Sequence, residues 1–220
     1  MSAWTDFVQR WKSCQACPLA QQRDRICLAR GTVPCDVLFC GEAPGASEDA
    51  LGQPFVGPAG KLLDQIIERS LPPTVTHVLT NLVCCFPKEA KASGENEPHT
   101  AEIRACRPRL IEFVNLARPR LIVCVGALAA DHVDHADTVR CADIVHPAAI
   151  LRMPLAQKQM AVQRAIVVIR NAVEDMLAAP RTEFTEWGTK YADIKTHDRK
   201  RVRADYNDWA KTGDGREIPF

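Results

Sequence analysis

Residues 36–60 read DVLFCGEAPGASEDALGQPFVGPAG, and this stretch decides the fold. It opens with an apolar run, residues 37–40, that stops at Gly41, as a buried parallel strand does. A loop rich in glycine and proline follows as far as Gly60, and the apolar residues of 62–67 then have helical spacing. A strand, a glycine-rich loop and a helix in this order predict one unit of an α/β fold. The ligand site of such a fold lies beyond the carboxyl ends of the strands.

The same alternation of strand and helix continues to residue 178. Short apolar runs predict further strands at 77–83, 120–125 and 143–146, and helical spacing predicts further helices at 103–114, 127–133 and 155–178. Strands that alternate with helices indicate a sheet whose strands run mostly parallel. We therefore expect an α/β protein, built as a three-layer α/β/α sandwich with a central, mostly parallel, four-stranded sheet.

The chain divides near Pro180, after the last predicted helix. Residues 1–180 form the predicted domain, and residues 181–220 form an extension of charges of both signs. The extension also contains two tryptophans and two tyrosines, and this is too aromatic for a solvated linker: Trp187, Tyr191, Tyr206 and Trp209. We expect the extension to pack on the core and to leave its basic residues exposed.

Composition narrows the classes of function. The 220 residues are 46% hydrophobic and carry a formal net charge of +1, so a nucleic-acid site would need locally clustered Lys and Arg. No apolar run reaches the length of a membrane span, and the first residues lack the apolar core of a signal peptide. We expect a cytoplasmic monomer, in which ten cysteines point to metal binding rather than to disulfide bonds.

Four cysteines are candidates for a metal centre. Cys14 and Cys17 are separated by two residues, so one turn brings both thiolates to the same centre. Cys85 ends a predicted strand, and Cys106 lies in the following helix, within reach of a returning loop. Spacing alone leaves zinc and an iron–sulfur cluster open, because both accept four thiolates. The other cysteines are expected to be small buried residues: Cys27, Cys35, Cys40, Cys84, Cys124 and Cys141.

Three segments, in order along the chain, resemble the family-4 uracil-DNA glycosylases. The first is residues 41–60, whose pattern of GEAPG, then ED, then GQPFVGPAG is long and specific. The second is TNLVCCFP at residues 80–87, and the third is HPAAILRMP at residues 146–154. The pair of cysteines at 14 and 17 precedes the first segment, as in that family. The resemblance covers about residues 10–178.

This resemblance implies an enzyme that flips uracil out of DNA and hydrolyses its N-glycosidic bond, leaving an abasic site for base excision repair. No lysine for strand cleavage is implied, so the expected activity is that of a monofunctional glycosylase. The resemblance also implies a [4Fe–4S] cluster with a structural or DNA-positioning role. Its ligands fall on Cys14, Cys17, Cys85 and Cys106, the last within an ACRP segment that matches the family.

The resemblance and the chemistry of the side chains together assign a base pocket. Phe55 offers a flat face on which a flipped base stacks. Asn81 accepts from the N3–H of uracil and donates to O4, which cytosine cannot match. His146 donates to O2, where negative charge develops. Glu42 is the expected carboxylate for the attacking water, with Asp49 as the second choice.

A second set of residues faces the DNA or forms the backbone of the pocket. Glycines in the loop let backbone N–H groups approach the base and phosphates, an apolar side chain fills the gap left by the flipped nucleotide, and an arginine binds a phosphate. The residues are Gly41 and Ala43 at the base, Gly45 and Gly57 in the loop, Leu151 as the wedge, and Arg152 at the phosphate.

Three features depart from that family. The stretch between Gly126 and His146 is short where a longer hairpin is usual, the loop 88–99 is longer, and residues 181–220 are extra. Glu95 falls near the position where a related subgroup has the histidine that traps its product, so covalent trapping is not expected. Two alternatives stay open, a glycosylase for a different or modified base in phage or anti-phage biology, and a non-catalytic iron–sulfur protein that binds DNA. A zinc module is a more distant third.

Overall fold

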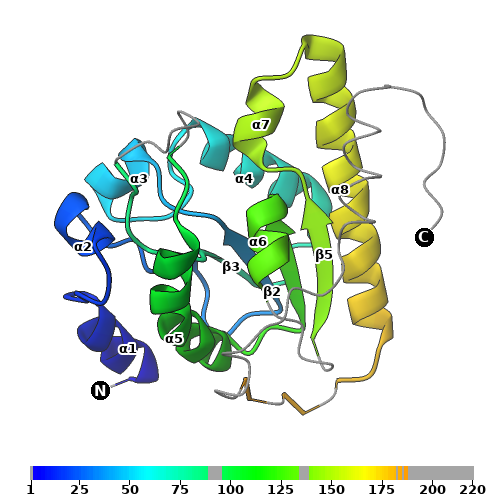
Figure 1. The fold of residues 1–220 in the computed structure, drawn as a ribbon. Helices are drawn as coiled ribbons and strands as arrows, with labels where there is room; N and C mark the ends of the chain where they lie inside the picture. Colours follow the sequence, from blue (N-terminus) through cyan, green and yellow to red (C-terminus); the bar gives the residue numbers. More distant parts are fainter. Residues whose placement is uncertain (1, 89–95, 134–138, 182, 185, 188–220) are drawn as a thin grey trace.

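The structure is a computed structural model, and it describes residues 2–88, 96–133, 139–181, 183, 184, 186 and 187 (Figure 1). The helices are α1 (Ala3–Trp11), α2 (Leu19–Gln22), α3 (Ala46–Leu51), α4 (Pro58–Ser70), α5 (Thr100–Ala117), α6 (Ala127–His132), α7 (Pro147–Leu151) and α8 (Leu155–Ala178). The strands are β1 (Arg30–Gly31), β2 (Val37–Gly41), β3 (His77–Asn81), β4 (Leu121–Val125) and β5 (Arg140–Ile144). None of the helices in these ranges is both long and apolar enough to cross a membrane.

One sheet runs through the centre of the molecule, with the strand order β1-β3-β2-β4-β5. The strands β3, β2, β4 and β5 pair in parallel, and β1 pairs antiparallel with β3. The predicted fold class is confirmed, and the sheet has one strand more than the four predicted. The additional strand, β1, has only two residues, too few for an apolar pattern to reveal it.

Helices cover both faces of the sheet, and the central strands β2 and β4 are buried at every position. Successive side chains of a strand point to opposite faces. Accordingly, Phe39 of β2 belongs to one core with Leu63 of α4 and Ile166 of α8. Cys40 belongs to the opposite core with Phe113 of α5. In Figure 1, α1, α2 and α5 lie on one side of the sheet and α8 runs along the other, which completes the three layers.

The carboxyl ends of the parallel strands meet at one edge of the sheet. Gly41 at the end of β2 is in register with Asn81 at the end of β3. Val125 at the end of β4 is in register with Ile144 of β5, two residues before His146. The three segments predicted to carry function therefore leave the sheet at the same edge, as expected for an α/β fold.

The described part of the C-terminal extension packs on the core. Trp187 is only 4% exposed and lies in the same core as Phe113. The amide of Trp187 donates to Oδ1 of Asn115 at 2.7 Å, and Nδ2 of Asn115 donates to the Trp187 carbonyl at 3.0 Å. Trp187 is thus part of the core although it follows the predicted boundary at residue 180. The basic run predicted to be exposed lies outside the described residues.

Candidate active site

Gly41 brings two of the predicted pocket residues together. A Cβ atom placed on Gly41 would overlap the ring of Phe55 and would lie 2.5 Å from Oδ1 of Asn81. Real Cβ atoms do not approach other atoms so closely, so this position requires glycine. An aromatic ring and a side-chain amide therefore meet at the end of β2, as the sequence predicts.

The amide oxygen of Asn81 has no hydrogen-bond partner in the part of the chain that the structure describes. The residue is 2% exposed, and its Oδ1 is buried without a hydrogen bond to any described residue. Leaving a buried acceptor unpaired costs about 1–3 kcal/mol, so such groups in native proteins call for an explanation. An acceptor in this position, beside an aromatic ring, fits a ligand that donates a hydrogen bond.

Phe55 is held in a backbone conformation that most residues avoid. Its φ is +57°, in the left-handed region. Arg30 of β1 fixes this turn, because Nε donates to the Pro54 carbonyl at 3.0 Å and Nη2 donates to the Phe55 carbonyl at 2.9 Å. Nη2 also forms an ion pair with Asp64 of α4 at 2.8 Å. The short edge strand β1 therefore supports the site, because its Arg30 fixes the turn at Phe55.

Glu48 organises the loop that carries Phe55. Its Oε1 accepts from the backbone amides of Val56 at 2.9 Å and Gly57 at 2.7 Å, and its Oε2 accepts from Gly45 at 3.1 Å. The N–H groups of Gly45 and Gly57, predicted to approach DNA, are therefore already engaged. The motif alone does not reveal this role, although an acidic residue in the first turn of a helix is a recognised capping signal.

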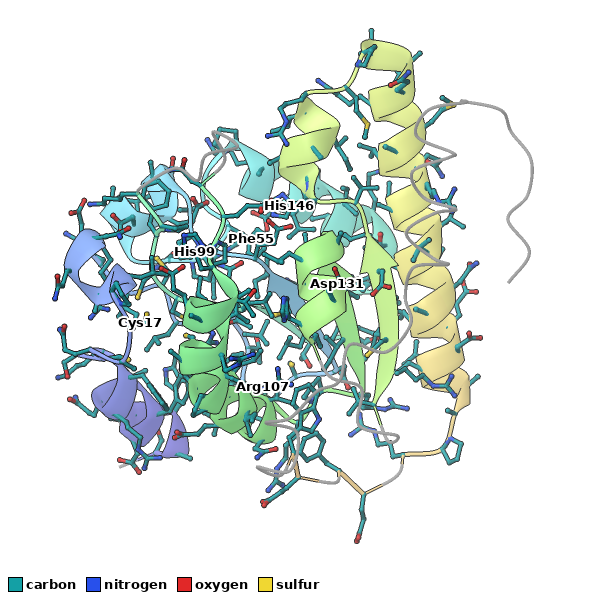
Figure 2. All side chains as sticks on the ribbon, viewed as in Figure 1. Cys17, Phe55, His99, Arg107, Asp131 and His146 are labelled. Atoms are coloured by element: carbon teal, nitrogen blue, oxygen red, sulfur yellow. The ribbon has the colours of Figure 1, made fainter. Side chains whose placement is uncertain are left out.

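His146 and Glu42 meet on the other side of the pocket. A Cβ atom on Gly126, which has a φ of +99°, would lie 2.5 Å from Oε1 of Glu42 and 3.1 Å from Cβ of His146. The rings of Phe55 and His146 have centroids 6.5 Å apart (Figure 2). Glu42, Phe55, Asn81 and His146 therefore lie close together at the same edge of the sheet.

The imidazole of His146 is a neutral hydrogen-bond donor at neutral pH. Its Nδ1 accepts from the amide of Ala148 at 3.2 Å, which assigns the proton to Nε2. Burial and, to a lesser extent, the positive charge of Arg152 together lower the pKa of His146 to about 4, and the negative charge of Glu48 partly opposes them. A neutral ring with its proton on Nε2 can donate without carrying charge itself.

Asp49 does not share the space occupied by Glu42. It is 1% exposed, and its carboxylate accepts from the backbone amides of Asp24 at 2.9 Å and Arg25 at 3.2 Å. Nζ of Lys88 pairs with it at 3.2 Å. These bonds anchor the segment before β1 to α3, which favours Glu42 over Asp49 as the carboxylate of the pocket.

The remaining predicted residues lie in the segments that follow β2 and β5. Ala43 is half-buried and packs against the core on the α5 side. Leu151 and Arg152 end the short helix α7, which begins directly after His146, and both side chains are exposed. An exposed leucine beside an exposed arginine suits contact with another molecule.

Four cysteines from different parts of the chain line one small cavity that is partly open to solvent. Cys14 and Cys17 come from the segment between α1 and α2, Cys85 follows β3, and Cys106 belongs to α5. All ten cysteines of the chain are free thiols. The four predicted ligands are therefore brought together, and a fifth cysteine that the sequence did not single out, Cys84, also lines the cavity.

Two arginine side chains lie beside the cavity cysteines. Among the described residues, no three His, Cys, Asp or Glu side chains are placed to hold one metal ion. Arg23 donates to Sγ of Cys85 at 3.1 Å and Arg109 to Sγ of Cys106 at 3.6 Å. Four thiolates with two guanidinium groups beside them match the ligand set and negative charge of a four-cysteine iron–sulfur cluster.

The comparisons with known proteins agree with this geometry. Residues 30–169 match the family model described as "Uracil DNA glycosylase superfamily". The chain is 37% identical over 119 residues to a protein of Pyrobaculum aerophilum named "Type-4 uracil-DNA glycosylase", and this match covers 54% of the chain and 58% of the relative. Proteins of the same name from Archaeoglobus fulgidus and Thermotoga maritima are 32% and 34% identical. Those matches cover 60% and 55% of this chain and 64% and 60% of the relatives. The matched region thus spans less than two thirds of each.

We predict that acid destabilises the protein in part through His146. The unfolded chain binds a proton on this residue near pH 6.5, whereas the folded protein does so only near pH 4, so the unfolded state binds more protons between those values. The free energy of unfolding should fall by about 2 kcal/mol from this residue alone between pH 7 and pH 5.

The measurement is urea unfolding at both pH values for the wild type and for His146→Gln, which cannot titrate in this range. The wild type should lose more stability than the variant on acidification. Equal losses would show that His146 takes up its proton equally easily in both states.

Proposed function

The chain belongs to the uracil DNA glycosylase superfamily, and on this premise we propose that it hydrolyses the N-glycosidic bond of uracil in DNA and leaves an abasic site. The observation that carries the proposal is the buried, unpartnered Oδ1 of Asn81 beside the ring of Phe55. A flat ligand with a hydrogen-bond donor on its edge satisfies both groups. Uracil, with its N3–H, is such a ligand.

Asn81 provides the selectivity of the pocket in this proposal. Its Oδ1 accepts from the N3–H of uracil, and the NH₂ of the same amide donates to O4. Cytosine carries an acceptor at N3 and a donor at C4, so a fixed amide meets both with the wrong group. Nη2 of Arg109 donates to the backbone carbonyl of Asn81 at 2.7 Å, and this bond fixes the backbone that carries the side-chain amide.

His146 stabilises the departing base. As the glycosidic bond breaks, negative charge accumulates on the base, and a donor at O2 lowers the energy of that state. His146 is neutral and carries its proton on Nε2, so it can donate to the anion without a prior protonation step. The base stacks on the ring of Phe55, and this stacking fixes the plane of the base beside the imidazole of His146.

Glu42 acts on the sugar side. Its carboxylate lies against Gly126 next to His146, at the strand-end edge of the sheet. There it can orient the attacking water, and its charge also favours the positive character that the sugar gains in the transition state. Asp49 is engaged by backbone amides and serves as an anchor of the loop.

The DNA is bound along the opening of the pocket. Leu151 inserts where the flipped nucleotide leaves a gap, and Arg152 binds a neighbouring phosphate. Gly41 and Ala43 form the wall beside the base, while Gly45 and Gly57 allow the loop to pass close to the duplex. Extraction of the base costs a few kcal/mol, which these contacts offset.

Cys14, Cys17, Cys85 and Cys106 hold a [4Fe–4S] cluster in this proposal. The bound cluster supplies a cross-link between distant segments rather than hydrolytic chemistry. Its four ligands tie the segment between α1 and α2 to the end of β3 and to α5. None of the ten cysteines forms a disulfide bond, which agrees with a protein that works in the reducing cytoplasm, and we propose that it acts there as a monomer.

We predict that the wild type releases uracil from a synthetic duplex, and that Asn81→Ala lowers kcat/KM for uracil by roughly 10- to 100-fold, because one buried hydrogen-bond match is lost. The assay follows strand scission at the abasic site after alkali treatment. Duplexes with hypoxanthine, a thymine mispair or a modified pyrimidine are tested in parallel. Binding to a product duplex that already contains an abasic site serves as the control, and it should change little in the variant.

The same panel separates the alternatives. Release of a modified base in preference to uracil would replace the proposed substrate. Binding without release of any base would indicate a non-catalytic DNA-binding protein.

We also predict that the protein purified in air contains iron and shows the broad visible absorbance of an iron–sulfur cluster. Cys85→Ala should lose iron and folding yield, because Cys85 lines the cavity. Cys124→Ala is the control, since Cys124 is also buried but belongs to β4 and does not line the cavity. Zinc in place of iron, or equal iron in both variants, would contradict the assignment.

A further inference from the structure

A buried arginine lies between the cysteine cavity and the base pocket. Arg109 is 1% exposed and belongs to α5, one helical turn after Cys106. Its Nη1 donates to Oγ1 of Thr80 at 3.1 Å, and its Nη2 donates to the carbonyls of Asn81 at 2.7 Å and Leu82 at 2.8 Å. The same nitrogen lies 3.6 Å from Sγ of Cys106. One guanidinium therefore contacts both a predicted cluster ligand and the backbone of the residue that reads the base.

The charge of Arg109 lacks a carboxylate partner among the described residues. Its hydrogen-bond contacts there are Sγ of Cys106 and the hydroxyl and carbonyl oxygens of residues 80–82. A buried guanidinium is costly unless negative charge lies nearby. A cysteine bound to a cluster is a thiolate, so the balancing charge arrives with the cluster.

We propose that Arg109 is a positioning residue that couples the cluster at Cys106 to the base-reading amide of Asn81. The inference rests on the proposed function, since it needs a base for Asn81 to read. With the thiolate in place, the guanidinium is oriented between Cys106 and the carbonyls at the end of β3. Without the thiolate, the guanidinium loses its charged partner, and its hydrogen bonds to the carbonyls of Asn81 and Leu82 weaken.

The contact with Leu82 extends this hold to the neighbouring strand. The amide of Leu82 donates to the carbonyl of Gly41 at 2.9 Å, and Gly41 is the residue against which Phe55 and Asn81 pack. Displacement of the end of β3 therefore moves the amide of Asn81 relative to the ring of Phe55. The expected consequence is poorer discrimination of uracil rather than weaker binding to DNA in general.

Two other arginines provide matched controls, because each makes only half of these contacts. Arg23 contacts the cavity, through Sγ of Cys85 and the carbonyl of Cys14, and none of its bonds reaches the end of β3. Arg30 contacts the pocket through the carbonyls of Pro54 and Phe55 and lies beside no cavity cysteine. Arg23→Met should alter the cluster alone, and Arg30→Met should alter base recognition alone.

The test compares Arg109→Lys and Arg109→Met with these controls in two readouts. The first is the reduction potential and visible spectrum of the bound cluster. The second is the ratio of Kd values for two duplexes that differ only in one base, and that contain either 2′-fluoro-2′-deoxycytidine or 2′-fluoro-2′-deoxyuridine at that position. The fluorine disfavours the positive charge of the sugar in the transition state, so the second duplex binds without being cleaved.

Arg109→Lys keeps the positive charge but cannot form all the hydrogen bonds of the guanidinium, so it should shift the reduction potential and the visible spectrum of the cluster. It should also reduce the preference for the uracil analogue about tenfold. Its affinity for the 2′-fluoro-2′-deoxycytidine duplex should stay near that of the wild type. A folded Arg109→Lys protein in which only one readout changes, or neither, overturns the coupling. Absence of any preference in the wild type instead overturns the proposed function, while the cluster readout still reports on the contact with Cys106.

A measurement on the wild type keeps the inference testable if both Arg109 variants fail to fold. Removal of the cluster by a chelator and oxidant should shift the carbonyl carbon resonance of Asn81 in the folded protein, because the guanidinium that holds it is released. The carbonyl of Val125 at the end of β4, which Arg109 does not contact, is the internal control. An unchanged Asn81 resonance after loss of the cluster overturns the coupling.

Discussion

The missing side chain at Gly41 is the constraint on which the site depends. It lets the ring of Phe55 and the amide of Asn81 approach the end of β2 more closely than any Cβ atom would allow. Parallel strands bring the two glycines Gly41 and Gly126 to the same edge of the sheet, and each admits functional side chains from a different segment. The pocket therefore follows from parallel strand ends combined with two positions that lack a side chain.

In our proposal, the residues that contact the base are fixed in place by charged side chains that do not contact it. Arg30 clamps the turn of Phe55, Glu48 binds three amides of the same loop, and Arg109 holds the carbonyl of Asn81. Each of these side chains forms hydrogen bonds with the backbone, so it fixes the backbone conformation rather than a single side-chain rotamer. Such support keeps Oδ1 of Asn81 in place without a partner, because the surrounding bonds offset the cost of the unpaired acceptor.

Much of this arrangement could be predicted from the sequence, because strong local patterns determine it. The buried runs identify β2, β3 and β4, and the apolar spacing of 155–178 matches α8. Short elements were not predictable: α3 has six residues within a glycine-rich loop, and β5 lies three residues earlier than its weak apolar pattern indicates. Adjacent acidic residues at 48 and 49 point to different sides of one helix, which the motif does not distinguish. A buried arginine such as Arg109 carries no signal, since arginine in a helix normally indicates an exposed face.

The central claim is that Phe55, Asn81, His146 and Glu42 form one pocket for a flipped uracil. The most direct measurement is a crystal structure of the protein with a duplex that carries 2′-fluoro-2′-deoxyuridine. The account predicts the uracil ring stacked on Phe55, its N3 within hydrogen-bonding distance of Oδ1 of Asn81, and its O2 facing Nε2 of His146. A uracil that stays stacked in the duplex, or an Asn81 oxygen that remains unpaired beside a base bound elsewhere, would contradict it.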